Sequence, residues 1–365
     1  SEMTSWLKGG VNMSFAHSMQ NYPVSSDTKT SNVINAGRTM PGFYPIYEVN
    51  PNDGSIIYKD GSPVPDFGPY RPSGSMANWN LPATLDKSER MKDEFSGRTF
   101  LEVTFIPGLK FKTSFNFDLI NYNSLDFTNS LIGPSVTTGG GSSRVNTRTF
   151  SWTWNNIATY DKTIGEHHFN ILVGQEAYSY RYDELSASRT KMALPNMPEL
   201  VVGSQLTGGS GYRIDYALVG YFSQFLYDYQ DKYFFSASYR RDGSSRFAPE
   251  TRWGNFWSVG ASWRIDREDF MVSTSDWLSA LTLKASYGAQ GNDNLGTYYA
   301  SKGLYTIVSN LGENALVSDR IATPKLKWET NLNFNVGVDF SLWNNRVSGS
   351  FDFFQRRSKD LLYSR

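Results

Sequence analysis

The residues from Lys325 to Phe340 fall into two alternating sets, one largely apolar and one polar. The first set is Leu326, Trp328, Thr330, Leu332, Phe334, Val336, Val338 and Phe340. The second set is Lys327, Glu329, Asn331, Asn333, Asn335, Gly337 and Asp339. A period of two is typical of a β-strand and not of an α-helix, so the segment predicts one long strand with an apolar and a polar face. Strands in soluble sheets usually have only about five or six residues.

A second strand follows at once and matches the first. The segment from Val347 to Phe353 alternates in the same way, and the connection before it contains Asn344 and Asn345. Asparagine is favoured in tight turns that need a positive φ. The length of this connection sets Val347 opposite Phe340 or Leu342, so the apolar faces of the two strands coincide.

The same pattern recurs along the whole chain and predicts eleven antiparallel strands. Aromatic side chains are frequent near their ends, as in the interfacial girdles of membrane barrels. The predicted strands cover residues 4–16, 96–106, 109–123, 147–160, 167–182, 212–228, 232–242, 252–265, 280–290, 325–341 and 346–359.

The connections between these strands alternate between short turns and long loops. The long ones are rich in Gly, Ser, Asn, Pro and Tyr, and they cover residues 17–95, 124–146, 183–211 and 291–324. Short turns on one side of a sheet and long loops on the other are the pattern of an outer-membrane β-barrel. We therefore predict an all-β fold, an antiparallel transmembrane barrel, with these four loops extracellular.

The composition excludes several other classes. The chain has 35 basic and 35 acidic residues, whereas a nucleic-acid-binding protein needs a basic surface. It has no cysteine, which rules out disulfides and thiolate zinc sites. No apolar run approaches the length of a transmembrane helix, and Ser1-Glu2-Met3 does not begin a signal peptide. An exported protein with this sequence is expected to be a mature or truncated chain.

Several motifs in the right order resemble the SusC/RagA family of TonB-dependent outer-membrane transporters. They are Tyr227-Asp228-Tyr229-Gln230-Asp231-Lys232-Tyr233, Arg241-Asp242-Gly243-Ser244-Ser245-Arg246-Phe247, Arg252-Trp253-Gly254, Lys284-Ala285-Ser286-Tyr287-Gly288 with Gly291-Asn292, Leu326-Lys327-Trp328-Glu329, and Asn345-Arg346-Val347 leading to Lys359-Asp360-Leu361-Leu362. The resemblance covers nearly the whole chain.

The resemblance implies a part of an active importer of oligosaccharides, or in some members oligopeptides, in the outer membrane of Bacteroidetes-type bacteria. Family members have a barrel of about 22 strands around a plug domain, and TonB pulls on the plug. A SusD-like lipoprotein caps the barrel, and lipid or lipopolysaccharide surrounds it. We find no plug and no TonB box, so residues 1–365 are expected to be a partial barrel. About eleven further strands should then pair with the segments 4–16 and 346–359.

Signals for catalysis or a bound metal are weak, and we expect no enzyme activity and no cofactor. His167 and His168 are neighbours on a strand, so they point to opposite faces and cannot easily share a metal. Asp266, Glu268 and Asp269 lie in a short, solvated connection, where charge without catalysis is the simpler interpretation. The run 291–294 has oxygen ligands but no distal Glu, so it is more typical of a Gly/Asn turn than of a calcium loop.

Substrate contacts are expected from aromatic and polar side chains in the long loops. Sugar rings stack on aromatic faces while polar groups bind the hydroxyls, although packing of the loops on each other is an alternative role. The candidates for substrate binding are Asn292, Asp293, Tyr298, Tyr299, Tyr70 and Trp79.

Two other functions remain open from the sequence. A passive porin or an outer-membrane adhesin would have the same strands without energy coupling, and a plug with a TonB box would distinguish the transporter. A soluble carbohydrate-binding β protein would not need detergent for solubility. In the barrel interpretation Leu332, Phe334, Val336 and Val338 face lipid, and Asn333, Asn335 and Asp339 face the interior.

Overall fold

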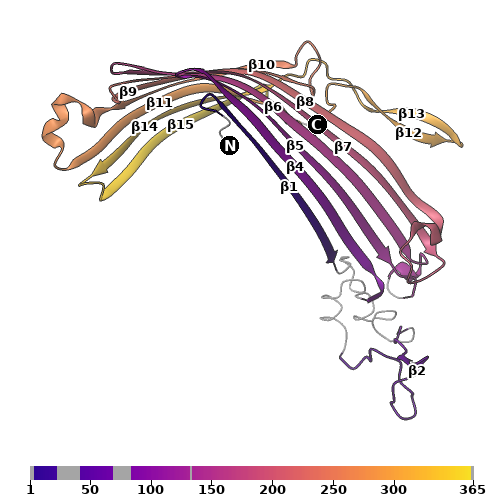
Figure 1. Cartoon of the computed structure of the whole chain (residues 1–365). Helices are drawn as coiled ribbons and strands as arrows, with labels where there is room; N and C mark the ends of the chain where they lie inside the picture. The colour runs from indigo at the N-terminus through magenta and orange to yellow at the C-terminus, as the bar shows by residue number, and fades with distance from the viewer. Residues whose placement is uncertain (1–3, 23–41, 69–83, 132–133, 363–365) are drawn as a thin grey trace.

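The computed structural model describes residues 4–22, 42–68, 84–131 and 134–362, and it is dominated by one curved antiparallel sheet (Figure 1). Its eleven strands lie in the order β1-β4-β5-β6-β7-β8-β9-β10-β11-β14-β15, so each strand pairs with its neighbour in this chain order. The strands are β1 (Leu7–Tyr22), β4 (Lys87–Ile106), β5 (Leu109–Thr128), β6 (Gly141–Ile164), β7 (His167–Met192), β8 (Gly203–Tyr229), β9 (Tyr233–Ser244), β10 (Trp253–Arg264), β11 (Leu278–Asn292), β14 (Glu329–Leu342) and β15 (Val347–Lys359).

The remaining elements are small and lie in the connections. Two hairpins stand outside the large sheet, β2 (Tyr58–Lys59) with β3 (Ser62–Pro63) and β12 (Leu304–Asn310) with β13 (Glu313–Arg320). Four short 3₁₀ helices are η1 (Pro134–Val136), η2 (Leu200–Val202), η3 (Ile265–Arg267) and η4 (Asp269–Thr274). Within the described residues no helix has the length and apolar character needed to cross a bilayer.

All eleven predicted strands are present, in the predicted order and pairing. Leu342 lies opposite Val347, and Trp343, Asn344 and Asn345 all have positive φ, as the turn prediction required. Every strand pair in the large sheet is antiparallel. The prediction of the fold class is therefore confirmed.

Most strands run farther toward the long connections than predicted. β6 begins at Gly141, β7 reaches Met192 and β8 begins at Gly203, so much of 124–146 and 183–211 is strand and not loop. The segment 17–95 likewise contains the end of β1 and the start of β4, and 291–324 contains the β12–β13 hairpin. The backbone hydrogen bonds between the strands continue in these parts, but the side chains on both faces become polar. The alternation of apolar and polar residues, from which the strands were predicted, therefore ends before the strands do.

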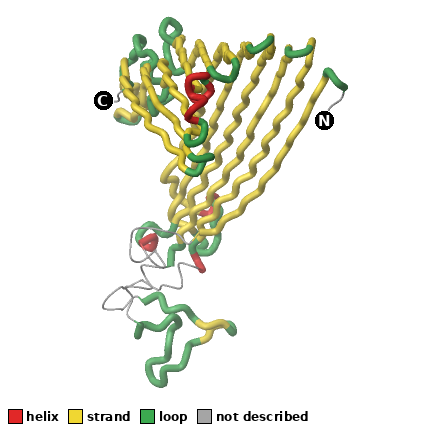
Figure 2. Tube along the Cα trace, turned by 90° about the vertical axis from the view of Figure 1, so that its left-hand side faces the viewer, coloured by secondary structure: helices red, strands yellow, loops and turns green. Residues whose placement is uncertain are grey.

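The two faces of the sheet differ in polarity as the alternation predicts. Through the register, Val336 lies in one row with Phe353, Ala285 and Phe235, whereas Asn335 lies beside Ser286 on the other face. The polar face carries ion pairs, such as Lys284 Nζ with the carboxylates of Asp339 at 2.8 Å and Asp352 at 3.1 Å. It also carries a shallow hollow lined by Ser236, Lys284, Ser286 and Asn335, as expected on the inner side of the curved sheet seen in Figure 2.

Two groups of stacked aromatic rings mark the limits of the apolar outer face. Tyr229, Tyr233 and Trp263 stack near the short turns, and Tyr221 stacks on Trp253 ten residues higher along β10. Ten residues span about 33 Å along a strand, or about 23 Å normal to the membrane at a tilt of about 45°. This height is close to the apolar band of an outer-membrane barrel, which is about 25 Å tall, so the parts of β7 and β8 above the level of Trp253 project past the membrane.

The sheet is open in the described residues. β1 and β15 form its two edges and do not pair with each other. The segments 4–16 and 346–359 therefore keep a free edge for further strands, as the partial-barrel interpretation expected.

Candidate functional site

A cluster at the mouth end of the sheet supports the loops that follow β9 and β11. Phe247, Phe256 and Trp328 are buried against one another, with Leu295 packed beside them. The Trp328 indole donates a hydrogen bond to the carbonyl oxygen of Arg252, at 2.8 Å. The β9–β10 connection, the loop after β11 and the start of β14 are thus held together at one point.

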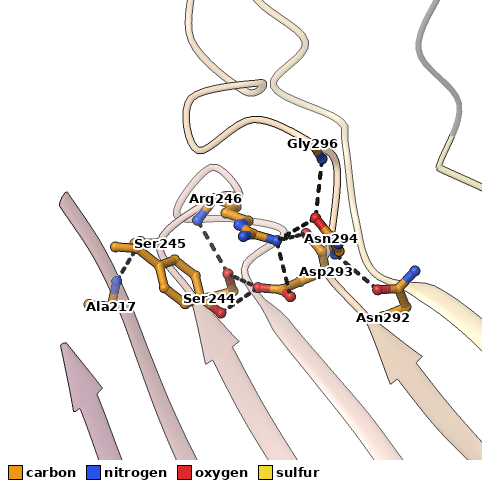
Figure 3. A network of polar contacts seen from close by, with 9 residues as sticks. Ala217, Ser244, Ser245, Arg246, Asn292, Asp293, Asn294 and Gly296 are labelled. Atoms are coloured by element: carbon orange, nitrogen blue, oxygen red, sulfur yellow. Dashed lines mark hydrogen bonds and ion pairs between the residues drawn. The ribbon is translucent and has the colours of Figure 1, made fainter. Parts of the chain in front are cut away.

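Asp293 is the polar centre of this region (Figure 3). Its Oδ2 accepts hydrogen bonds from the Tyr216 hydroxyl at 2.8 Å and from the Ser244 hydroxyl at 2.7 Å. Arg246 Nη1 donates to the Asp293 carbonyl oxygen at 2.8 Å and lies 3.4 Å from its Oδ1. The side chains of Arg246 and Asp293 are only 11% and 15% exposed, so solvent screens this pair weakly.

Arg246 also lies over two aromatic rings. Its guanidinium carbon is 4.7 Å from the ring centre of Tyr216 and 4.8 Å from that of Tyr298. This arrangement combines an ion pair with cation–π contacts, and it fixes the loop after β11 to strand β8.

A row of tyrosines extends from this centre along the inner face of β7 and β8. Tyr298 stacks on Tyr180 at 6.0 Å and 11°, and it contacts Tyr216 at 5.7 Å. Further along the row, the ring centres of Tyr182 and Tyr212 are 5.9 Å apart, and both hydroxyls donate to Oε2 of Glu184. Tyr178 completes the row beside Tyr216. The row lies beyond the upper aromatic rings, where the strands project past the membrane.

The environment favours the neutral form of two phenols of this row, Tyr182 and Tyr216. Burial, followed by the hydrogen bond to Asp293, raises the pKa of Tyr216 above its usual value. Burial and the bond to Glu184 do the same for the pKa of Tyr182. The row presents half-buried aromatic faces together with hydroxyl groups, which can stack on a ring and bind its polar substituents.

Four of the six predicted binding residues lie in this region. Asn292 ends β11 and accepts a hydrogen bond from the N–H of Asn294, while Asp293 and Tyr298 take the central positions described above. The Tyr299 hydroxyl accepts a hydrogen bond from the backbone N–H of Asp215, at 2.9 Å. Tyr70 and Trp79 lie outside the described residues.

The residues that surround Tyr298 were not among the predicted binding residues. Tyr180, Tyr182 and Tyr216 lie in strands, and Arg246 was noticed only as part of a family motif. The alternation Tyr178-Ser179-Tyr180-Arg181-Tyr182 was the available signal, because it places three tyrosines on one face of a strand.

The histidines considered for metal binding and the carboxylates considered for acid–base chemistry have structural partners. Among the described residues no group of three or more His, Asp and Glu side chains could hold a metal. His167 packs on Tyr229 on the outer face, whereas His168 pairs with Asp228 on the inner face. Asp266 binds Arg264 and the N–H of Leu281, so the short connection after β10 uses its charge to hold the chain.

Comparisons with known proteins agree with this architecture. A family model described as TonB dependent receptor-like, beta-barrel, matches residues 26–365. The chain is 29% identical over 329 residues to TonB-dependent receptor P3 of Formosa agariphila, covering 86% of this chain and 32% of that receptor. It is 30% identical over 222 residues to the TonB-dependent receptor SusC of Bacteroides thetaiotaomicron, covering 59% of this chain and 22% of SusC.

A solved structure gives the same result. The RagAB peptide transporter matches with a TM-score of 0.77 at 25% identity, covering 99% of this chain and 39% of that chain. The chain spans about a third or less of the curated relatives it matches.

Proposed function

Since the chain belongs to the TonB-dependent receptor-like β-barrel family and is SusC/RagA-like, we propose that it forms part of an active importer of oligosaccharides. The sheet is a part of a barrel in the outer membrane of a Gram-negative bacterium of the Bacteroidetes type. Membership in this receptor family fits the expectation that the chain carries no catalytic site. A plug elsewhere in the protein would couple uptake to TonB.

The tyrosine row at the mouth supports the choice of substrate. Tyr180, Tyr298 and Tyr216 offer ring faces on the inner side of the sheet, and Arg246 and Asp293 fix their positions. Flat rings next to hydroxyl and carboxylate groups match the alternating apolar and polar surfaces of a sugar. Asn292 and Tyr299 flank this row and remain our candidates for further contacts.

Removal of the ring platform tests this proposal in the complete receptor. The double variant Tyr180→Ala, Tyr298→Ala should lower affinity for the cognate oligosaccharide by about tenfold or more and slow growth on it. Tyr287→Ala is the matched control, because Tyr287 lies on the outer face of β11, next to Trp257. Unchanged binding and growth in the double variant would remove the row from the substrate path.

A peptide is the second candidate substrate. The similarity to the RagAB peptide transporter over nearly the whole chain favours it. Titration of the same receptor with oligopeptides and with oligosaccharides decides between these two substrate classes. A separate test concerns energy coupling, because uptake that persists without TonB would indicate a passive porin.

The β12–β13 hairpin is our candidate contact for a SusD-like lipoprotein. It projects away from the sheet (Figure 1), and Tyr305, Ile307 and Leu316 are 68%, 69% and 72% exposed. An isolated hairpin with apolar side chains in water is marginally stable, so a partner should cover it. A photo-crosslinker at Tyr305 should capture the lipoprotein in native membranes. Crosslinks to periplasmic proteins alone would reverse the proposed orientation.

A further inference from the structure

The outer face of the sheet changes from apolar to polar at one point of β6. Within residues 150–160 the outward side chains are apolar except Asn156. This stretch is as long as the one between Trp253 and Trp263, which mark the limits of the apolar band on β10. The next outward residue of β6 is Arg148. A further two residues rise by about 5 Å along the membrane normal, so Arg148 lies in the layer of lipid head groups.

The neighbouring strands reach the same limit in one register row. Phe95 of β4 lies opposite Leu119 of β5, and Leu119 lies opposite Phe150 of β6. The next outward row is polar, and in it Asn121 lies opposite Arg148. The change from apolar to polar side chains therefore extends over several strands.

The tilt of the strands explains why this limit and Tyr221 of the upper rings lie in different register rows. The row of Tyr221 meets β6 at Asn156, six residues below Phe150. The short turns shift in the same direction, because Leu109 at the start of β5 lies opposite Tyr160, four residues above the end of β6. Both edges of the apolar band thus rise from β8 toward β4, as tilted strands in a barrel require.

Four side chains with free hydrogen-bond donors gather just above this limit. They line one open hollow on the outer face, the outer hollow, and they are Asn121, Asn123, Asn146 and Arg148. Within the part of the chain that the structure describes, none of the four side chains forms a hydrogen bond or an ion pair. Carboxamides and a guanidinium that converge in this way can donate to several oxygen atoms of one ligand.

The acidic side chains on the same face have partners of their own. Asp183 lies opposite Arg148 but pairs with Arg213 Nε at 2.6 Å. Asp93 lies 2.6 Å from Nδ1 of His17. Arg148 is therefore available to an anionic ligand.

Exposed aromatic rings lie directly below the outer hollow. Phe15, Phe95 and Phe150 are 68%, 36% and 36% exposed in the last apolar row. Acyl chains can lie against these rings while a head group reaches the level of Arg148. Arginine donates two parallel hydrogen bonds to phosphate, so the surface matches an amphipathic ligand that carries a phosphate group.

We propose that Arg148, Asn121, Asn123 and Asn146 bind the phosphorylated head group of an outer-leaflet lipid, the lipid A part of lipopolysaccharide. The Arg148 guanidinium donates to two phosphate oxygens, and the amides donate to the remaining oxygen and to the sugar hydroxyls. The inference rests on the proposed barrel and on the extracellular position of its long loops, and it does not involve the imported substrate.

Binding of lipid A to the full-length receptor tests the proposal. Native mass spectrometry in mild detergent gives the dissociation constant for a lipid A with one phosphate group, and Arg148→Gln should raise it by about tenfold. Arg346→Gln is the matched control and should leave the constant unchanged, because Arg346 is exposed in the short turn between β14 and β15, at the opposite end of the strands. Equal constants for the wild type and Arg148→Gln would overturn the proposal.

Removal of the phosphate group shows whether Arg148 recognises it. Dephosphorylated lipid A should bind the wild type about tenfold more weakly, and Arg148→Gln should then have no further effect, because the interacting pair is already broken. Inorganic phosphate should not compete, since it has no acyl chains. An equal effect of Arg148→Gln on both lipids, or competition by inorganic phosphate, would reject the site. The assay contains no substrate, so its failure would leave the tyrosine row unaffected.

Discussion

Asp293 is the residue on which the mouth region depends most. It accepts hydrogen bonds from Tyr216, Ser244 and Arg246, so it joins the loop after β11 to β8, to β9 and to the β9–β10 connection. Its first role is therefore to position the tyrosine rings, and its loss should act on binding through Tyr298.

Substitution of Asp293 should loosen this loop. Asp293→Ala leaves a poorly exposed guanidinium without its carboxylate, which costs about 3 kcal/mol, so exchange of the Asn294 and Gly296 amides should accelerate by about a hundredfold. Asp293→Asn keeps an acceptor for the hydroxyls and should have a smaller effect. Hydrogen exchange followed by mass spectrometry measures both, and equal protection in the wild type and Asp293→Ala would contradict this role.

Glu268 should make stability depend on pH. It accepts hydrogen bonds from the Tyr233 hydroxyl and the Trp263 indole, and these two bonds hold its pKa below the usual value. A lowered pKa in the folded state adds stability above the unfolded pKa of about 4.3, and this stability is lost as the pH falls further.

The Glu268→Gln variant should therefore melt below the wild type at pH 7, and the difference should disappear near pH 3. Asp269→Asn is the control, because Asp269 is a neighbouring carboxylate to which no side chain of the described residues donates a hydrogen bond. A difference in melting temperature that stays the same at both pH values would show that the charge of Glu268 is not responsible.

The alternation along each strand decides which face meets lipid. In β14, Val336 lies in a row with Phe353 and Ala285, whereas the amide of Asn335 donates to the Ser286 hydroxyl on the other face. Val336→Arg should therefore destabilise the folded barrel by about 2–4 kcal/mol, and Asn335→Arg by much less. Folding of the complete receptor into lipid vesicles measures the two values, and equal costs would remove the assignment of the faces.

At the scale of the whole molecule, the sheet formed by the described residues is open, and its two edges require further strands. An unpaired strand edge in hydrocarbon leaves backbone groups without partners, at several kcal/mol for each group. We expect about eleven more strands, so that β1 and β15 are both paired in the complete receptor. All β15 amides should then exchange slowly there. Rapid exchange at every second amide, or direct pairing of β1 with β15 in a small closed barrel, would contradict this expectation.

The sequence by itself determined the number of strands, their order and the polarity of their faces. These properties follow from local alternation and from short turns such as that at Asn344 and Asn345, so each can be recognised within about twenty residues. The same locality explains why the strand ends were predicted too short. Beyond the membrane the outer face of β7 carries Arg181 and Asp183, so the two faces no longer differ in polarity. The pairing of β7 with β6 nevertheless continues there.

Only the tertiary structure decided which distant side chains meet. Tyr298 stacks on Tyr180 and contacts Tyr216, although the three residues lie in a loop and in two different strands. Such encounters depend on the offset between neighbouring strands, and these offsets add up across the sheet. A shift of one residue at any turn would move the partners to opposite faces, so the row of tyrosines could be located only once the full register was known.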